Sequence, residues 1–272
     1  MMIQSTRMQI KVLFQRKGVY ITSLIILLLV IQNFLDNVFS LAYQDVIHMC
    51  APYKLLMLSD MGKNFLLFLL YPFLIVLPAA FSYMDDTNNR ETNFICSRVG
   101  VKNYYLGKLA AVFVVTFVAV IIPLLMDYFL NVVSFPLGAT GDKYNIDYYQ
   151  PVSRERIGNY FLVGIYVKAP YFHAFISTLF FGVCSGIFGC FAAAVSFLRV
   201  RYKVFLFLPF FILYNISLRL GNMFGFYTEL SDYLIIHDGV TKSYLYFGGL
   251  LLAMICFILL VTVKSIRRGW LE

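Results

Sequence analysis

Residues 109–130 read LAAVFVVTFVAVIIPLLMDYFL, an apolar run in which Asp127 is the one charged residue. A helix needs about 20 mainly apolar residues to cross the hydrocarbon core of a bilayer, and this run is long enough. A second run, residues 65–84, reads FLLFLLYPFLIVLPAAFSYM. The two runs predict a pair of membrane-spanning helices joined by a polar stretch, residues 85–108.

Four more apolar segments lie outward from this pair, so we predict an all-α membrane protein with six transmembrane helices. The predicted spans cover residues 18–40, 65–84, 109–130, 172–197, 204–219 and 244–263. The composition agrees, because 61% of the residues are hydrophobic and 13% are charged, whereas a typical soluble domain has about 25% charged residues. The fifth span is the weakest, since Asn215, Ser217 and Arg219 interrupt it.

The basic residues give the predicted orientation. Of the 22 Lys and Arg residues, most fall on one side of the spans, namely Arg7, Lys11, Arg16, Lys17, Arg90, Arg98, Lys102, Lys108, Arg199, Arg201, Lys203, Lys264, Arg267 and Arg268. Cytoplasmic segments of membrane proteins carry the excess of Lys and Arg, so both termini are expected in the cytoplasm. These residues are divided among short segments rather than gathered on one face, so we expect no nucleic-acid partner.

This orientation divides the chain into parts. We expect a cytoplasmic amphipathic segment 1–17, a six-helix membrane domain 18–263 and a cytoplasmic tail 264–272. Within the membrane domain, residues 85–108 form an inner loop and residues 131–171 an outer loop. The lipid bilayer is the first partner that the sequence predicts.

A polar stripe marks the outer half of the first span. Gln32, Asn33, Asp36 and Asn37 recur at spacings of three to four residues and therefore share one helix face. Two interpretations stay open: the stripe lines an outward-facing substrate path or makes a helix contact, or the helix simply leaves the hydrocarbon near Gln32. Asp127, near the outer end of the third span, poses the same choice.

Small residues in the fourth span predict close helix packing. Gly182-xxx-Gly186 and Ser185-xxx-Gly189 each place two small side chains one turn apart. Such spacing lets a neighbouring helix approach closely in a membrane. Packing within the chain is the favoured use over a subunit interface.

The inner loop carries a short apolar patch, Phe94 and Ile95, inside a polar sequence. A short helix over Glu91–Ser97 would present this patch to a partner, with Glu91 and Arg98 as flanking charges. A plain surface loop is the alternative.

The chain resembles the permease subunits of ABC-2 type transporters. The likeness rests on Glu91, Thr92 and Arg98 in the inner loop and on Gly107-Lys108-Leu109-Ala110 at the entry to the third span. That family also has a basic amphipathic amino-terminal segment. In this chain Ile3, Ile10 and Phe14 share a face of that segment, while Met8 and Val12 fall opposite.

The resemblance implies a type V exporter-like architecture in a bacterial plasma membrane. It implies a coupling helix formed by Glu91, Thr92, Phe94, Ile95 and Arg98, which docks into a separate ABC ATPase subunit. It further implies a second permease subunit, like or unlike, and the export of a peptide, lipid-like or drug-like substrate. ATP and Mg²⁺ would be bound by the partner ATPase, so no cofactor is expected in this chain.

No catalytic or metal-binding residues are expected. A phosphate-binding loop needs Gly-x4-Gly-Lys-Ser/Thr, but Leu109 follows Lys108, and Gly100 lies seven residues before Gly107. The Cys and His residues show no metal-ligand spacing. Two other classes stay open: a membrane-embedded enzyme, and a channel or immunity protein that works without an ATPase.

Overall fold

The computed structural model describes residues 2–43, 45–46, 49–59, 64–138, 160–198, 200, 202–224, 230–236 and 244–269. Within these residues the regular structure is helical throughout. The elements are α1 (Met2–Phe14), α2 (Lys17–Leu41), η2 (Pro52–Lys54), α3 (Phe65–Val76), α4 (Ser82–Asn88), α5 (Glu91–Val99), α6 (Val101–Ser134), α9 (Val163–Lys168), α10 (Pro170–Ser196), η3 (Lys203–Leu206), α11 (Phe207–Phe224), α12 (Leu230–Leu234) and α13 (Tyr244–Gly269).

Four helices are long and apolar enough to cross a membrane: α2, α6, α10 and α13. The prediction of an all-α membrane protein is confirmed at this level. The other two predicted spans correspond to shorter apolar helices, α3 and the segment Lys203–Ile216. Some boundaries differ from the prediction: α6 starts at Val101, so the last eight residues of the predicted inner loop, 101–108, are helical.

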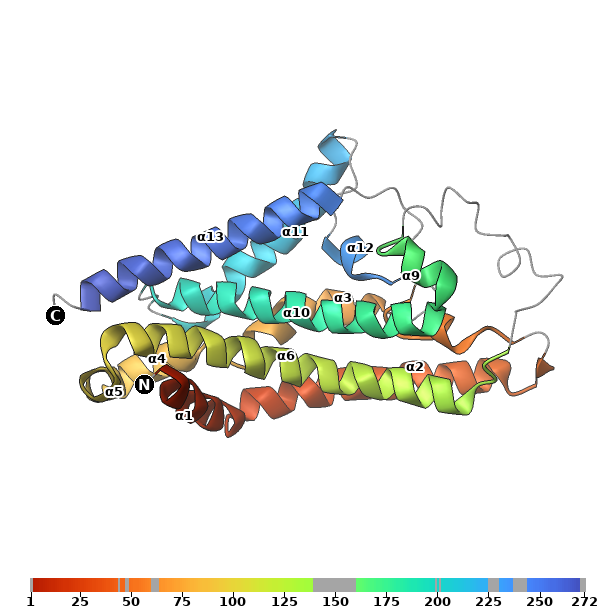
Figure 1. Ribbon diagram of the computed structural model, residues 1–272, viewed down its shortest axis with the longest axis horizontal. Coiled ribbons are helices and arrows are strands. Elements are labelled where there is room, and N and C mark those ends of the chain that lie inside the picture. The colour runs from red at the N-terminus through yellow and green to blue at the C-terminus, as the bar shows by residue number, and fades with distance from the viewer. Residues whose placement is uncertain are drawn as a thin grey trace.

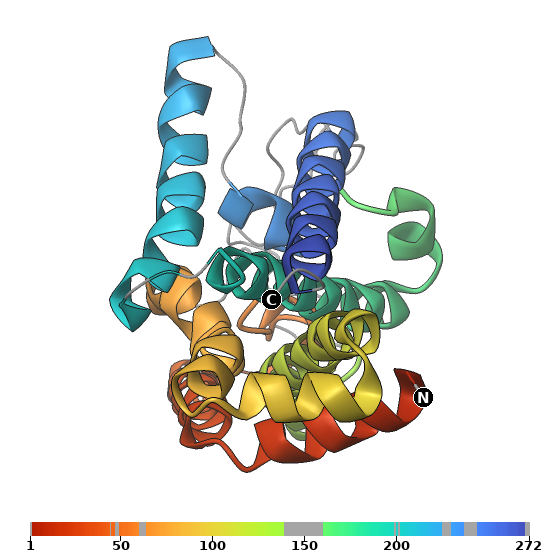
Figure 2. The ribbon, with the colours of Figure 1, turned by 90° about the vertical axis from the view of Figure 1, so that its left-hand side faces the viewer.

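The long helices pack into one bundle. Helices α2, α6 and α10 run side by side, and α13 lies across α10 (Figure 1). Helix α1, the α4–α5 segment and the carboxyl end of α13 all lie at the same end of the bundle (Figure 1). Seen from that end, α11 and α13 lie apart from each other and both extend to the same side of α10 (Figure 2). Part of the predicted outer loop, residues 139–159, and the last three residues of the tail lie outside the described residues.

Small residues in α10 allow it to lie close to α6. A Cβ atom at Gly186 would stand 2.7 Å from the Phe113 ring, and one at Gly189 would stand 2.7 Å from Thr116 Oγ1. Larger side chains would force the two helices apart. The prediction that this small-residue pattern serves packing within the chain is confirmed.

The predicted second span is broken near Pro78. Proline has no amide hydrogen, so the carbonyl of Leu74 loses the donor that an α-helix would supply from residue 78. The Thr22 hydroxyl donates to this carbonyl instead, at 3.3 Å. The contact is possible because α2 comes very close here: a Cβ at Gly18 would lie 2.3 Å from the Leu77 carbonyl oxygen. As a result α3 ends at Val76, and the chain turns before α4.

Helix α1 packs along the first turns of α6 through a polar stripe. The Ser5 hydroxyl donates to the Asn103 carbonyl at 3.3 Å, and the Gln9 amide donates to the Tyr104 carbonyl at 3.2 Å. Ser5, Gln9 and Leu13 are the buried residues of this face, whereas Ile3 is 84% exposed. The contact with α6 is thus partly polar. Of the residues on the predicted apolar face, Ile10 and Phe14 pack against the core of the bundle, and Ile3 is exposed.

Candidate functional site

Helix α5 is a short surface helix held between two left-handed residues. Arg90, before its first residue, has a φ of 58°, and Gly100, after its last, has a φ of 86°. A left-handed conformation at a residue other than glycine costs about 1–2 kcal/mol, so the turn at Arg90 is held by its surroundings. The two turns set α5 off from α4 and α6. The short helix predicted over Glu91–Ser97 is confirmed.

The side chains of α5 divide into an outward and an inward set. Phe94 is 71% exposed, although it is a large apolar residue. Glu91 and Arg98 are exposed as well. Ile95 instead packs against the core of the bundle, and Thr92 is half-buried. Of the five residues predicted to contact an ATPase, the structure thus turns Phe94, Glu91 and Arg98 outward, while Ile95 anchors the helix.

Two adjacent carboxylates lie behind α5 and collect four polar partners. Asp86 Oδ2 accepts hydrogen bonds from Lys108 Nζ and from the Tyr104 hydroxyl, each at 2.6 Å. Asp85 pairs with Arg16 through Oδ2, and its Oδ1 lies 2.6 Å from Lys203 Nζ. Asp85 and Asp86 therefore connect α4 to the start of α2, to α6 and to η3.

The electrostatics of Asp85 follow from these partners. Partial burial by itself raises the pKa of this carboxyl group. The Lys203 ammonium and the Arg16 guanidinium outweigh that effect, so the pKa lies below the ordinary value of 3.8. Asp85 is thus an ionised group that holds two cations at the end of the bundle.

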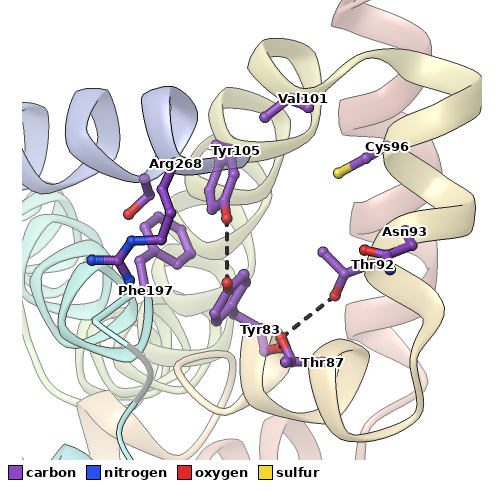
Figure 3. A pocket seen from close by; sticks show the side chains of 10 residues that line it. Tyr83, Thr87, Thr92, Asn93, Cys96, Val101, Tyr105, Phe197 and Arg268 are labelled. Carbon is purple, nitrogen blue, oxygen red and sulfur yellow. Dashed lines mark hydrogen bonds between the residues drawn. The ribbon is translucent and has the colours of Figure 1, made fainter. Parts of the chain in front are cut away.

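A small cavity separates α5 from the end of α13. Its volume is about 110 Å³, and the lining residues are Tyr83, Thr87, Thr92, Asn93, Cys96, Val101, Tyr105, Phe197, Ser265 and Arg268. Figure 3 shows Arg268 and Phe197 on one side of the space and the α5 residues on the other, with Tyr83 and Tyr105 between them. The Tyr83 and Tyr105 hydroxyls hydrogen-bond to each other at 3.2 Å. Burial and the charge of Asp86 raise the pKa of the Cys96 thiol.

The predicted polar stripe lies at the opposite end of the bundle and holds an inserted loop. Asp127 is 2% exposed, and its Oδ2 accepts from the backbone amide of Met57 at 2.6 Å. The side-chain amides of Asn33 and Asn37 donate to the Leu55 carbonyl at 3.1 and 2.9 Å. Residues 55–59 are buried where these bonds form.

These bonds bear on the choice that the sequence left open. Hydrogen bonds join three of the five predicted path residues to the backbone of the inserted loop, namely Asn33, Asn37 and Asp127. The Asn33 side-chain amide also donates to Asp127 Oδ1 at 3.5 Å. Gln32 is exposed and Asp36 is partly exposed. The hydrogen bonds of the three grouped residues are directed at protein backbone, which favours a structural role over a substrate path.

The charge network behind α5 was not predicted from the sequence. Asp85 and Asp86 stood out only as the polar start of the inner loop, and Lys108 only as part of the Gly-Lys-Leu-Ala entry. Their partner Arg16 lies 69 positions from Asp85 along the chain. One signal was available: Asp85, Asp86 and Lys108 each border an apolar run, where an unpaired charge is expensive.

No family model, no curated protein and no solved structure matches this chain. Within the described residues, no group of three or more His, Cys, Asp or Glu side chains is placed to hold a metal ion. The geometry of α5 and of the charge network behind it is therefore the basis for a functional proposal.

Proposed function

We propose that this chain is the membrane-spanning subunit of an ABC-2 type transporter, with α5 as the helix that couples it to a separate ATPase. The observation that carries the proposal is Phe94: a large apolar side chain, 71% exposed, on a short helix set off from the bundle by two sharp turns. Phe94 lies outside the predicted membrane spans, so contact with lipid tails does not account for its exposure, and aromatic side chains are enriched in protein–protein contacts. Glu91 and Arg98 supply polar contacts at its two ends.

In this proposal the chain crosses a bacterial plasma membrane six times, with both termini in the cytoplasm. At 1.5 Å per residue, the 18 residues of α11 extend about 27 Å, close to the thickness of a hydrocarbon core. Helix α3 alone, with 12 residues, extends about 18 Å, and residues 77–84, the turn and the start of α4, complete that crossing. The position of α1, α5 and the end of α13 at one end of the bundle supports an even number of crossings.

The charge network supplies a physical route from α5 to the membrane helices. Helix α5 packs on α4 and α6. Asp85 in α4 holds Arg16 at the start of α2 and Lys203 in η3, directly before α11. Asp86 holds Lys108 in α6. A displacement of α5 by a closing ATPase dimer would therefore move the ends of three spans together, which is what alternating access requires.

A second permease subunit has surface available. Large apolar side chains are exposed along α11 and α13, among them Leu208, Ile212, Ile216, Leu252, Leu259 and Leu260. In a membrane such faces meet either lipid or another subunit. The substrate class follows only from the family resemblance: a peptide, a lipid-like compound or a drug-like compound.

The test is co-purification of an ATP-binding subunit with the tagged chain from its own membranes, followed by the Phe94→Asp variant. We expect the partner to carry a phosphate-binding loop, and we expect Phe94→Asp to reduce its recovery at least tenfold. Asn88→Asp is the matched control, since it adds the same charge at an exposed position of α4. Ile95 is a poor choice because its replacement would also loosen α5 from the core. Full recovery of the ATPase with Phe94→Asp would remove α5 as the coupling element.

A further inference from the structure

We infer that a groove between the α1–α2 junction, the turn after α3 and the start of η3 binds an anionic phospholipid. The volume of the groove is about 650 Å³, within the range of about 300–1,000 Å³ that ligand sites usually have. Two kinds of side chain line it. The charged ones are Arg16, Lys17, Asp85 and Lys203, and the apolar ones include Ile21 and Phe81.

The charged residues of the groove lie where three predicted spans begin or end. Lys17 directly precedes the first span, 18–40, and Asp85 directly follows the second, 65–84. Lys203 directly precedes the fifth span, 204–219. These boundaries follow from the apolar runs along the chain, and the fold brings all three of them to one groove. The groove is therefore expected where the hydrocarbon meets the cytoplasmic water.

Apolar side chains continue the groove on the membrane side of these charges. Ile21, the fourth residue of the first span, is 46% exposed, and Phe81, three residues before the end of the second span, is half-buried. A phospholipid has the same division, with its charge in the headgroup and its chains in the hydrocarbon. A soluble anion would leave Ile21 and Phe81 uncovered, so the groove favours a lipid.

Two of the cations converge on one carboxylate in the groove. Arg16 pairs with Asp85 Oδ2, and Lys203 Nζ lies 2.6 Å from Oδ1 of the same side chain. An ammonium group has three donors and a guanidinium has five. The side chains of Lys203 and Arg16 are 52% and 23% exposed, so their remaining donors are accessible to a ligand. Hydrogen bonds of this kind to a phosphate are charge-assisted and strong.

The charge balance favours an anionic headgroup over a zwitterionic one. The groove and the pair behind it hold four cations and two carboxylates, a net charge of +2, namely Arg16, Lys17, Lys108, Lys203, Asp85 and Asp86. Lys17 has no ion pair within the part of the chain that the structure describes. Basic pockets between membrane helices on the cytoplasmic side are suited to phospholipid headgroups.

A headgroup in the groove would share Arg16 and Lys203 with Asp85. It would then join the network that connects the start of α2 and η3 to α4, so lipid composition would affect how these elements are held. The inference depends on the predicted crossings of the first two spans and on no ATPase. A failure to recover an ATPase would therefore leave it standing.

The test is the quenching of a single tryptophan by brominated lipid. The chain has one tryptophan, Trp270, so Phe81→Trp in a Trp270→Phe background places one reporter in the groove. The control reporter is Leu260→Trp in the same background. Leu260 is 71% exposed on α13 and, like Phe81, lies three residues before the predicted cytoplasmic end of its span.

The full chain is reconstituted into phosphatidylcholine vesicles that contain increasing fractions of one brominated lipid. The three lipids compared are phosphatidylglycerol, phosphatidylethanolamine and phosphatidylcholine, all brominated at the same positions of the acyl chains. The relative affinity of each lipid for the surroundings of the reporter is taken from the quenching curve. A parallel series replaces chloride by inorganic phosphate at equal ionic strength.

We expect Phe81→Trp to show at least a threefold preference for phosphatidylglycerol over phosphatidylcholine, and Leu260→Trp to show none. Lys17→Gln should lower this preference at least twofold. Lys264→Gln removes the same charge from an exposed position near the control reporter and should leave the preference at Phe81→Trp unchanged. Lys17→Gln is chosen over Lys203→Gln because it breaks no ion pair with Asp85. If Phe81→Trp does not fold, Ile21→Trp is the second reporter in the groove.

Four outcomes would overturn the inference. An absence of quenching by all three lipids would show that the groove does not face a membrane. An equal preference for phosphatidylglycerol at both reporters would mean a general attraction of anionic lipid to the basic end of the bundle. Equal affinities for phosphatidylethanolamine and phosphatidylglycerol would mean that net charge does not select the headgroup. A preference that disappears in inorganic phosphate would assign the groove to a soluble anion.

Discussion

Lys108 Nζ lies 2.6 Å from Asp86 Oδ2, and the side chains of both residues are more than nine-tenths buried. The ammonium group also stands 5.6 Å from the centre of the Tyr104 ring. Taking two charges out of water is costly, and the attraction between them repays that cost only when both are present and well bonded. Each of the two charges is therefore tolerated in the interior only because the other is present, and the pair as a whole need not stabilise the fold.

Removing either partner should be more damaging than removing both. We expect Lys108→Met or Asp86→Leu alone to destabilise the protein by about 3–5 kcal/mol, because each leaves a buried charge without its closest partner. After Lys108→Met, Asp86 keeps its longer contact with Arg16, at 3.8 Å. The double variant should recover much of that loss. Thermal unfolding of the four proteins in detergent, arranged as a double-mutant cycle, measures the coupling. Additive losses would show that the two charges are solvated independently.

The neighbouring Asp85 should make part of the stability pH-dependent. Its pKa in the folded protein is lowered, because Lys203 and Arg16 outweigh the effect of partial burial. A carboxyl group with a lowered pKa stabilises the folded state above its unfolded pKa, and this contribution is lost as the pH falls through the folded pKa. We therefore expect the wild-type protein to have a higher melting temperature than Asp85→Asn at pH 7 and at pH 5. This difference in melting temperature should shrink below about pH 4. A difference in melting temperature that stays constant down to pH 3 would contradict this.

Much of the helical framework was predictable from the sequence, because it depends on local apolar length. Residues 109–130 lie within α6, residues 172–196 of the predicted fourth span lie within α10, and Glu91–Ser97 is helical as expected. The break in the second span was signalled by Pro78, although its compensation by Thr22 was not, since that bond joins residues 52 positions apart.

The candidate site was harder to predict, because its contacts also join residues that are far apart in the sequence. An exposed Phe94 follows from a polar surrounding sequence, whereas the inward position of Ile95 depends on how α5 sits on the bundle. The cavity needs the end of α13 to come near α5, and these segments are about 170 residues apart in the sequence. Pairings at that distance leave no local pattern for periodicity or spacing to reveal.

Asp127 gives a test of the two interpretations of the polar stripe. Its carboxylate accepts from the Met57 amide at 2.6 Å and from the Asn131 side chain at 3.0 Å. Replacing Asp127 by Leu leaves the Met57 amide without this acceptor, which should cost about 1–3 kcal/mol for a buried group. The Asn131 side chain keeps its hydrogen bond to the backbone carbonyl of residue 127, at 2.9 Å. We expect a large loss of thermal stability in Asp127→Leu and a small one in Asp36→Leu, since Asp36 is partly exposed. Normal stability with altered transport in Asp127→Leu would restore the substrate-path interpretation.

The hydrogen bond from Thr22 to the Leu74 carbonyl should matter only because residue 78 is proline. Interhelical hydrogen bonds in membranes contribute about 0.6 kcal/mol on average, but a carbonyl left without any donor in the hydrocarbon is more costly. We expect Thr22→Val to lower stability by about 1–2 kcal/mol on this ground. In a Pro78→Ala background, residue 78 regains its amide and can serve the Leu74 carbonyl, so Thr22→Val should then cost far less.

A matched control for that experiment lies in α13. The Thr262 hydroxyl donates to the Ile258 carbonyl at 2.6 Å within its own helix. That carbonyl is also positioned to accept from the backbone amide of residue 262, as in any regular α-helix. Thr262→Val therefore makes the same chemical change at a buried threonine without stripping a carbonyl of its donor, and it should be nearly neutral. Equal losses for Thr22→Val in the wild-type and Pro78→Ala backgrounds would mean that the hydroxyl does not replace the amide that proline lacks.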